Sequence, residues 1–399
     1  MAVGVGGVAD EAGAAKVVEA VRDLVPVLGE RAEGAERAGK VPEESVRELA
    51  DAGLFRLLQP TRFGGLAAHP AHHYTAIKAV ARACGSTGWI SSVIGVHNWQ
   101  LALFPEQAQQ DVWGADPGTR ISSSYAPTGK VEAVDGGFLM SGRWAFSSGC
   151  EHADWAFLGG MTFGEDGAVD ARTYLVPRTV YRIEPNWDTQ GLRATGSHDI
   201  VIDEPVFVPE HRSLAYAHAL ALDCPGHAVN PEPVYKLPFG GLFTTTVTVP
   251  LLGVAEGAYQ TYIDVTRERF RVSYGQKVVE DPFAHVRIAR AASDVDAAWL
   301  QIERNVEEMY GHAVRGEELP LELRLRVRRD QVLGTERAVS STDLMVENAG
   351  GNAMRHAHPL QRYWRDVHTG RGHVANDPER ALTLFGRGAL GLDVHDTMI

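Results

Sequence analysis

The hydrophobic periodicity of this chain changes twice, near Arg120 and near Leu242, and these two changes limit the folds that it can adopt. Before the first change, residues 15–30 and 43–57 place apolar side chains at helical spacing. Between the changes, short β-rich segments such as KVEAV and ARTYLVP are separated by Gly, Asp and Pro turns. Long amphipathic helical segments return after the second change. This order predicts an α+β protein with an N-terminal α-helical domain (1–118), a central antiparallel β barrel or sandwich (119–215) and a C-terminal helical bundle (216–399).

Charge and cysteine content exclude several classes of protein. Lys and Arg total 38 against 51 Asp and Glu, a formal net charge of −13, whereas nucleic-acid binding needs clustered cations. No apolar run reaches the roughly 20 residues of a membrane span, and the N-terminus lacks the basic start of a signal peptide. Cys84, Cys150 and Cys224 lie far apart, and the histidines lack zinc-ligand spacing. We therefore expect a cytoplasmic protein with no membrane or nucleic-acid partner, no disulfide framework and no metal site.

The common nucleotide-binding and hydrolase motifs are either absent from this chain or lie outside their structural context. Residues 386–391 read GRGALG and match G-x-G-x-x-G, but they lie so close to the C-terminus that no βαβ unit can follow them. Neither a P-loop nor a G-x-S-x-G nucleophile elbow is present. A Rossmann domain and nucleophilic hydrolysis are therefore not expected.

Small hydroxyl groups beside bulky rings are the most informative polar feature. Ser123 precedes Tyr125 on an expected strand, and Ser147 and Ser148 follow the rings of RWAF. Small hydroxyls next to rings leave room for a flat ligand and can bond its heteroatoms. Ordinary serines at strand ends would give the same pattern. The residues alone therefore indicate a pocket for an aromatic ligand without identifying the ligand.

Two histidines are candidates for the same pocket. His97 lies in the apolar stretch IGVHNWQLALF, and His368 lies beside charged residues in RYWRDVHTGRGH. His97 could equally be a hydrogen-bonded core residue, and His368 an exposed residue at a helix end. Charged neighbours could also tune the pKa of His368 for proton transfer.

Long sequence blocks carry a family resemblance over almost the whole chain. They include CGSTGWISSVIGVHNWQLALF, RISSSYAP, GRWAFSSGC, DPFAHVRIARAASDVDAAW, QRYWRDVHTGR and HVANDPERA. With these blocks the chain resembles the oxygenase components of two-component flavin-dependent monooxygenases, which have the acyl-CoA dehydrogenase fold. The likeness is strongest to members that hydroxylate a phenolic seco-steroid; related members act on 4-hydroxyphenylacetate or aromatic polyketides.

The resemblance implies a chemistry and its cofactors. A separate NAD(P)H:flavin reductase would supply reduced FMN or FAD, which would react with O2 to form a C4a-hydroperoxyflavin. A phenolic, polycyclic substrate would then be hydroxylated ortho to its hydroxyl group. Such an intermediate must be kept from water, because early proton transfer releases hydrogen peroxide.

The resemblance also assigns roles to residues. It places Ser148 near flavin N5 with Ser147 beside it, makes His368 the active-site histidine, and has His97 orient the phenol oxygen. Ser123 is expected at the cofactor, and Trp89 and Tyr125 at the substrate. Arg271 matches the position of a flavin-phosphate arginine that often reaches across a subunit boundary, and Asn376 and Asp377 lie where the bundle meets the flavin. Sharing of that kind implies a homotetramer built through the C-terminal helices.

Three alternatives stay open at this stage. An acyl-CoA dehydrogenase-like flavoenzyme would need a glutamate base, but the stretch after Arg365 and Asp366 runs HTGRGHVANDPER without the expected motif. A flavin-dependent N-hydroxylase on the same fold is a second alternative. A non-enzymatic scaffold is the third, and it leaves the serine and histidine set unexplained.

Overall fold

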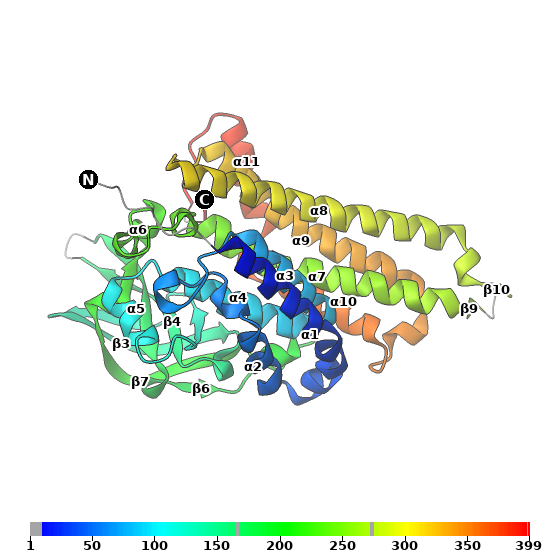
Figure 1. The fold of residues 1–399 in the computed structure, drawn as a ribbon, viewed down its shortest axis with the longest axis horizontal. Coiled ribbons are helices and arrows are strands. Elements are labelled where there is room, and N and C mark those ends of the chain that lie inside the picture. Colours follow the sequence, from blue (N-terminus) through cyan, green and yellow to red (C-terminus); the bar gives the residue numbers. More distant parts are fainter. Residues whose placement is uncertain (1–9, 165–166, 272–274, 397) are drawn as a thin grey trace.

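The computed structural model describes residues 10–164, 167–271, 275–396 and 398–399. The strands of its two four-stranded sheets gather at one end of the molecule, while the long C-terminal helices run side by side away from them (Figure 1). The N-terminal helices lie between these two parts. The cavity described below lies where all three parts meet.

The N-terminal part, as described from residue 10 onward, contains five α-helices. Pro42 precedes the second helix, and Glu43 and Glu44 occupy its first turn, where acidic groups favour the helix dipole. The third and fourth helices are separated at Cys84, and a Cβ on Gly88 would lie 2.4 Å from the Cβ of Ala81, so only glycine permits this close crossing. The helices are α1 (Glu11–Ala38), α2 (Glu43–Asp51), α3 (Pro70–Ala83), α4 (Gly85–Leu101) and α5 (Glu106–Trp113).

The central part is a sandwich of two open four-stranded sheets, so the closed barrel that the sequence left possible is wrong. One sheet has the strand order β1-β4-β5-β8 and the other β2-β3-β7-β6. The strands are β1 (Ile121–Ser124), β2 (Lys130–Val134), β3 (Gly137–Ser147), β4 (Trp155–Phe163), β5 (Val169–Pro177), β6 (Arg182–Glu184), β7 (His198–Pro209) and β8 (Ser213–Ala215).

The prediction of purely antiparallel pairing also fails at one place. β1 pairs with β4 in parallel, with Ile121 opposite Trp155. The hairpin of β2 and β3 lies between them in the chain but belongs to the other sheet, so β4 returns in the direction of β1. Alternation along a segment identifies a strand but does not reveal such a crossover. The core between the sheets includes Trp144, Tyr174 and Ile200.

The C-terminal part is a bundle in which α7 packs against α3 of the N-terminal part. A Cβ at Gly253 would lie 2.4 Å from the Lys78 carbonyl oxygen, and a Cβ at Gly257 equally close to that of Arg82. These small residues allow the two helix backbones to approach closely. The helices are α7 (Phe239–Glu268), α8 (Pro282–Arg315), α9 (Leu321–Ala349), α10 (Pro359–Arg371) and α11 (Pro378–Ala389), with the short β9 (Phe270–Arg271) and β10 (Gln276–Lys277) joining α7 to α8.

Helix α7 is long and apolar enough to cross a membrane by length and composition. However, 89% of its most apolar window is buried inside the protein, as is usual for a core helix. Its apolar character therefore reflects packing in the bundle and is only weak evidence for a membrane span.

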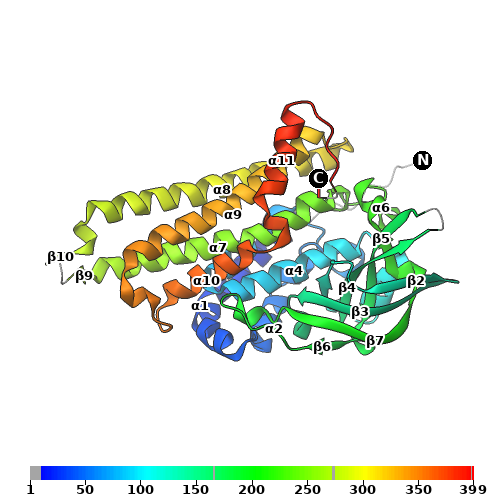
Figure 2. The same ribbon diagram turned by 180° about the vertical axis from the view of Figure 1, so that it is seen from behind.

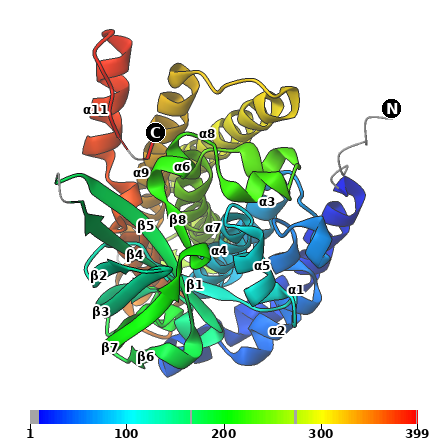
Figure 3. The ribbon, with the colours of Figure 1, turned by 90° about the vertical axis from the view of Figure 1, so that its left-hand side faces the viewer.

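The chain end folds back toward the cavity. Helix α11 projects from the bundle, and the chain returns from its end to the start of α7 (Figures 2 and 3). Arg380 donates from Nε to Asp396 Oδ2 over 2.6 Å and holds this returning segment on α11. Met398 packs so closely on Gly240 that a Cβ there would lie 2.3 Å from the Met398 carbonyl oxygen.

Candidate active site

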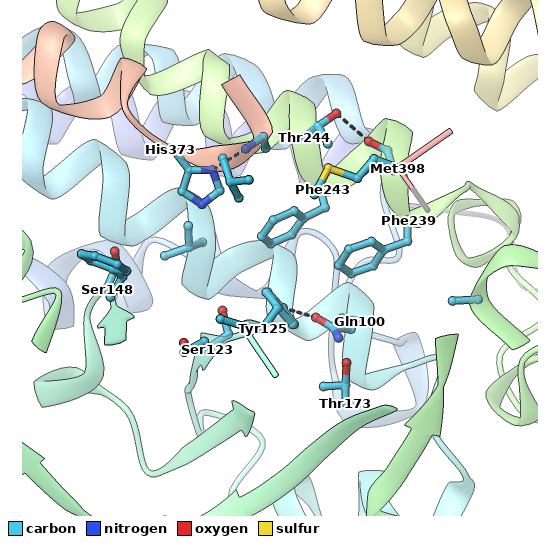
Figure 4. A pocket seen from close by; sticks show the side chains of 18 of the residues that line it. Gln100, Ser123, Tyr125, Ser148, Thr173, Phe239, Phe243, Thr244, His373 and Met398 are labelled. Carbon is cyan, nitrogen blue, oxygen red and sulfur yellow. Dashed lines mark hydrogen bonds between the residues drawn. The ribbon is translucent and has the colours of Figure 1, made fainter. Parts of the chain in front are cut away.

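A cavity of about 720 Å³ lies between the sandwich and the two sets of helices. Its lining comes from α4, from β1 and the end of β3, from the start of α7, and from the end of α10 with the turn that follows. Figure 4 shows two ends: Ser148 and His373 lie on one side, and Tyr125, Phe239, Gln100 and Thr173 on the other. A cavity of this size can hold a ligand of several fused rings.

The first end is lined by a chain of hydroxyl groups and is called the hydroxyl end below. The indole Nε1 of Trp89 donates to Ser148 Oγ over 3.1 Å. Ser148 Oγ lies 2.7 Å from Ser197 Oγ, which lies 2.7 Å from Thr195 Oγ1. Thr195 in turn donates to the carbonyl oxygen of Leu192. The chain is fixed at both ends by a protein group, so it can present oriented hydroxyls to a ligand.

A local distortion of β3 directs Ser148 into the cavity. The pairing with β7 is irregular between Trp144 and Ser147, and Phe146 has a φ of 68°, which is costly for a side chain of this size. The exposed ring of Phe146 meets that of Trp187 edge-on, with centroids 6.2 Å apart, and both residues line the cavity. Strained backbone of this kind concentrates at functional sites.

His373 faces the hydroxyl end from the turn after α10. Its Nδ1 accepts a hydrogen bond from the Ala375 backbone N–H over 3.1 Å, so the neutral ring carries its proton on Nε2. Burial, aided by the positive charge of Arg328, lowers the pKa of His373 to about 4. Its ring meets the Trp89 ring edge-on, with centroids 5.8 Å apart. His373 is therefore a neutral hydrogen-bond donor beside the Ser148 hydroxyl chain.

A buried polar network holds the turn that carries His373. Asn376 donates from Nδ2 to the Gly370 carbonyl oxygen over 2.9 Å, and its Oδ1 accepts from Gln331 Nε2 over 2.7 Å. Arg328 donates from Nη1 to the Ala375 carbonyl oxygen over 3.2 Å. These contacts join the end of α10 to α9, so the position of His373 is set from outside the cavity.

The second end is built from aromatic rings and is called the aromatic end below. Phe239 and Phe243, one turn apart on α7, stack with centroids 5.0 Å apart. The ring of Tyr125 meets both edge-on, at 5.8 and 5.2 Å. The Tyr125 hydroxyl donates to Gln100 Oε1, and burial raises the pKa of Tyr125, so that this phenol stays protonated. This end therefore offers flat apolar surfaces, the polar pair of Tyr125 and Gln100, and the hydroxyl of Thr173.

Comparisons with known proteins agree with this architecture. Family models for the acyl-CoA dehydrogenase N-terminal and C-terminal domains match residues 14–116 and 245–378. A flavin-dependent monooxygenase oxygenase subunit, HsaA from Rhodococcus jostii, is 51% identical over 94% of this chain and 98% of its own length. An FADH2-dependent resorcinol hydroxylase oxygenase component from Rhizobium is 32% identical over 95% of each chain. The crystal structure of 3-HSA hydroxylase from Rhodococcus superposes with a TM-score of 0.92 at 49% identity, covering 96% of this chain and 99% of that one.

The chain belongs to the family of oxygenase components of flavin-dependent monooxygenases. It is a monooxygenase that uses reduced FMN or FAD together with dioxygen, as the resemblance in the sequence indicated. Family membership also decides against the acyl-CoA dehydrogenase alternative.

The residues around the cavity fit a flavin. Thr369 Oγ1 and Arg324 Nε are both buried at the cavity lining and have no hydrogen-bond partner among the described residues. Ser148 and Ser197 offer hydroxyls, and Trp89 and Trp187 offer flat surfaces for a ring system. Unpartnered donors beside aromatic walls are expected where a polar, flat ligand binds.

Four of the predicted site residues line the cavity. Ser148 and Trp89 lie at the hydroxyl end, Tyr125 lies at the aromatic end, and Ser123 belongs to the wall next to Tyr125. Their proposed roles at the flavin or the substrate remain predictions, but the structure brings them to one space.

The two predicted histidines lie elsewhere, contrary to the expectation that both open into the pocket. His97 is fully buried behind the wall and donates from Nδ1 to the Ile121 carbonyl oxygen over 2.6 Å. His368 points to α9, where its Nε2 lies 2.9 Å from Asp343 Oδ1 and its ring packs on Trp364. His368 and His373 are five residues apart, which corresponds to different sides of a helix end.

The remaining predicted residues also lie outside the cavity wall in the described part of the chain. Ser147 is buried and does not line the cavity, although the neighbouring Ser148 does. Asn376 belongs to the buried network, and Asp377 accepts from the N–H groups that begin α11. Arg271 has a described backbone in β9, but most of the predicted segment, 272–274, lies outside the described residues.

Sequence reasoning missed His373, Ser197, Gln100 and the stacked rings of α7. A usable signal for His373 was the pair Gly372-His373 after the helical pattern of α10 ends, because a histidine in a turn is free to face a neighbouring domain. Gln100 carried no comparable signal, since every residue of α4 is buried and the helix has no distinguishable face.

Proposed function

We propose that this monooxygenase hydroxylates a phenol of several rings at the carbon next to its hydroxyl group. The observation that carries the proposal is the division of one cavity into a hydroxyl end with a neutral histidine and an aromatic end. The names of relatives add support, because one is a resorcinol hydroxylase and one a 3-HSA hydroxylase. The sequence resemblance points the same way, to a seco-steroid phenol or an aromatic polyketide.

The flavin ring is placed at the hydroxyl end, where Ser148 would hold its polar edge and Trp89 and Trp187 its faces. The reduced flavin, supplied by a separate NAD(P)H:flavin reductase, activates dioxygen, so that one oxygen atom enters the substrate and the other leaves as water. Ser148, fixed by Trp89 and Ser197, keeps a hydrogen bond at the reacting atoms and slows their loss to hydrogen peroxide.

His373 takes the place that the resemblance had assigned to His368, but as a hydrogen-bond donor rather than as a group that accepts the phenolic proton. Its Nε2–H is directed by the Nδ1 contact with Ala375, and the ring is neutral because its pKa is low. A donor placed at the phenolic oxygen favours the phenolate form of the substrate, whose electron-rich ring attacks the oxygen atom. Preorganised donors of this kind are worth about 10²–10³-fold in rate.

The rings of Tyr125, Phe239 and Phe243 bind the rest of the substrate and keep water out. Edge-to-face and stacked rings favour flat apolar ligands by roughly 0.5–1.5 kcal/mol beyond burial alone. The chain end at Met398 and Ile399 closes the same region.

We propose that the protein is a homotetramer and that the outer face of α8 forms an interface between its subunits. Phe283 is 71% exposed there, and the exposed apolar residues Val286, Leu300 and Val314 recur every fourteen residues, two heptads apart. That spacing keeps them on one stripe of the helix, which suits packing against another helix. Light scattering after size-exclusion chromatography checks the mass; a monomer at micromolar concentration would contradict this point.

The activity is tested by supplying reduced FMN or FAD from a reductase to a panel of phenols under ¹⁸O2. Product that is heavier by one ¹⁸O atom and hydroxylated next to the phenolic oxygen supports the proposal. Flavin oxidation to peroxide with every phenol, or oxygenation at nitrogen, would contradict it.

A further inference from the structure

The loop between β6 and β7 supplies part of the hydroxyl end. Trp187 and Thr195 of this loop, and Ser197 at its end, line the cavity. Leu192 lies near the middle of the loop and has a φ of 50°, which is unfavourable for a leucine. Strained backbone of this kind persists only where contacts from the surrounding structure hold it.

Asp366 on α10 makes such a contact from outside the cavity. Its Oδ1 accepts a hydrogen bond from the Leu192 backbone N–H over 2.6 Å. Asp366 is 4% exposed and does not line the cavity described above. A Cβ at Gly191 would lie 2.1 Å from the Arg365 carbonyl oxygen, so the loop backbone packs directly on α10. The position of the loop is therefore set by this helix.

The Leu192 carbonyl oxygen connects this contact to the cavity. It accepts from the Trp187 indole Nε1 and from Thr195 Oγ1, each over 2.9 Å. Thr195 is hydrogen-bonded to Ser197, and Ser197 to Ser148. A series of hydrogen bonds therefore runs from Asp366, through the Leu192 peptide groups, to the Ser148 hydroxyl.

This series also gives the Ser148 hydroxyl a direction. A carbonyl oxygen can only accept, so Thr195 donates to Leu192 and accepts from Ser197, which in turn accepts from Ser148. Ser148 Oγ then accepts from Trp89 and keeps its second lone pair for a ligand. Displacement of the Leu192 carbonyl group would leave every hydroxyl of the chain without a fixed orientation.

We propose that Asp366 is a positioning residue for the hydroxyl end, and that it fixes the place and the direction of the Ser148 hydroxyl through Leu192. The inference rests on the proposed function, in which a hydrogen bond of Ser148 limits the loss of hydrogen peroxide. It gives a carboxyl group outside the cavity a share in the control of coupling, the fraction of turnovers that yield hydroxylated product.

The first test needs neither flavin nor substrate. Hydrogen exchange of residues 191–197 is followed by mass spectrometry in the full-length protein without cofactor. In Asp366→Ala this segment should exchange at least about tenfold faster, because the loop loses its contact with α10. Asp366→Asn keeps an oxygen that can accept from Leu192, and its exchange should stay within about threefold of wild type. Burial raises the pKa of Asp366 to about 7, so a neutral amide is a close substitute.

Asp330→Ala is the matched control. Asp330 on α9 is 1% exposed, and its Oδ2 accepts from Arg304 and Asn305 away from the cavity. The substitution should lower Tm, because it breaks a buried polar cluster. It should leave the exchange of residues 191–197 unchanged.

The second test measures the ratio of product to hydrogen peroxide with reduced flavin, O2 and a phenol. Asp366→Ala should lower this ratio roughly tenfold, while KM for the phenol changes less than about twofold. Asp366→Asn and Asp330→Ala should keep the wild-type ratio. Thr195→Val breaks the same series, so the double variant with Asp366→Ala should lose no more than the more impaired single variant.

The outcomes separate two failures. Unchanged exchange in Asp366→Ala, or faster exchange with an unchanged ratio, overturns the role of Asp366. Additive losses in the double variant, or an Asp366→Asn variant that behaves like Asp366→Ala, also overturn it. If no phenol is hydroxylated by the wild-type protein, the proposed function fails, while the exchange measurement still decides whether Asp366 holds the loop.

A measurement on the wild-type protein decides the point if Asp366→Ala does not fold. Fragmentation of the exchanged peptide resolves the Leu192 amide, which should be among the slowly exchanging amides of the loop. Complete exchange of this amide within seconds would overturn the proposal.

Discussion

The two ends of the cavity are built on different principles. At the hydroxyl end, Ser148, Ser197 and Thr195 form a chain in which each hydroxyl has a partner, with Trp89 bonded at one end of the chain and a neutral histidine across from it. At the aromatic end, stacked and edge-on rings lie beside the polar pair of Tyr125 and Gln100, with Thr173 nearby. The difference indicates that the first end serves the reaction and the second serves recognition. A change of substrate would then need changes only at the aromatic end.

The largest expected effect distinguishes the two histidines after α10. His373→Ala should lower kcat for hydroxylation about 10²–10³-fold, because it removes the donor at the phenolic oxygen. His368→Ala is the matched control, since His368 pairs with Asp343 outside the cavity, and kcat should stay within about threefold. The rate of product formation in a single turnover is measured for both variants. A larger loss of kcat in His368→Ala than in His373→Ala would instead indicate that His368 is the active-site histidine.

The next effect compares two neighbouring serines at the end of β3, of which Ser148 lines the cavity and Ser147 does not. Ser148→Ala removes the middle of the hydroxyl chain, and the ratio of product to hydrogen peroxide should fall roughly tenfold for the loss of one hydrogen bond. Ser147→Ala should leave that ratio near the wild-type value, because Ser147 does not line the cavity. Equal ratios in the two variants would show that the hydroxyl chain does not control coupling.

A smaller effect is expected at the aromatic end, and it should appear in KM. Phe243→Leu keeps an apolar side chain but loses the edge-on contact with Tyr125, so KM for a polycyclic phenol should rise about three- to tenfold. The value of kcat should change less than twofold. Phe104→Leu is the control, because Phe104 stacks on Phe157 away from the cavity. If Phe243→Leu lowered kcat and left KM unchanged, the assignment of recognition to the aromatic end would be contradicted.

The smallest effect concerns pH. Because the pKa of His373 is about 4, its ring stays neutral as pH falls from 6.5, and the acid limb of kcat/KM should lie near pH 4. The unfolded chain binds this proton near 6.5, so His373 also lowers the free energy of unfolding as pH falls through that window.

Arg328→Met removes the neighbouring positive charge, so the pKa of His373 should rise and the acid limb should move to higher pH. Arg326→Met, whose partner is Glu308 on α8, should not move it. NMR titration of the imidazole checks the assignment. An acid limb that is unchanged in Arg328→Met would mean that burial alone sets the pKa.

Much of the fold could be predicted because it depends on local pattern. The changes of period near Arg120 and Leu242 separated the helical parts from the strand-rich part, as the structure has them. The parallel pairing of β1 with β4 could not be predicted, since it depends on which sheet the intervening hairpin joins. Open and closed arrangements of the same strands share one sequence pattern.

The site was predictable where a motif lies on a strand and not where it lies on a helix. Ser148 directly follows β3, and the rings that precede it in the sequence marked it as a candidate. Helix α4 is buried on every side, so its sequence could not show that His97 meets β1 while Gln100, one turn later, meets the cavity. His373 depends on a turn fixed by Asn376 and Gln331, contacts that join distant parts of the chain.

The location of the flavin is the central claim, and a crystal structure of the complex with reduced FMN or FAD tests it most directly. The ring system should lie at the hydroxyl end, within about 3.2 Å of Ser148 Oγ. The Nε2 of His373 should face the space between that ring and the aromatic end. A flavin bound elsewhere on the protein, with this cavity free of it, would contradict the account.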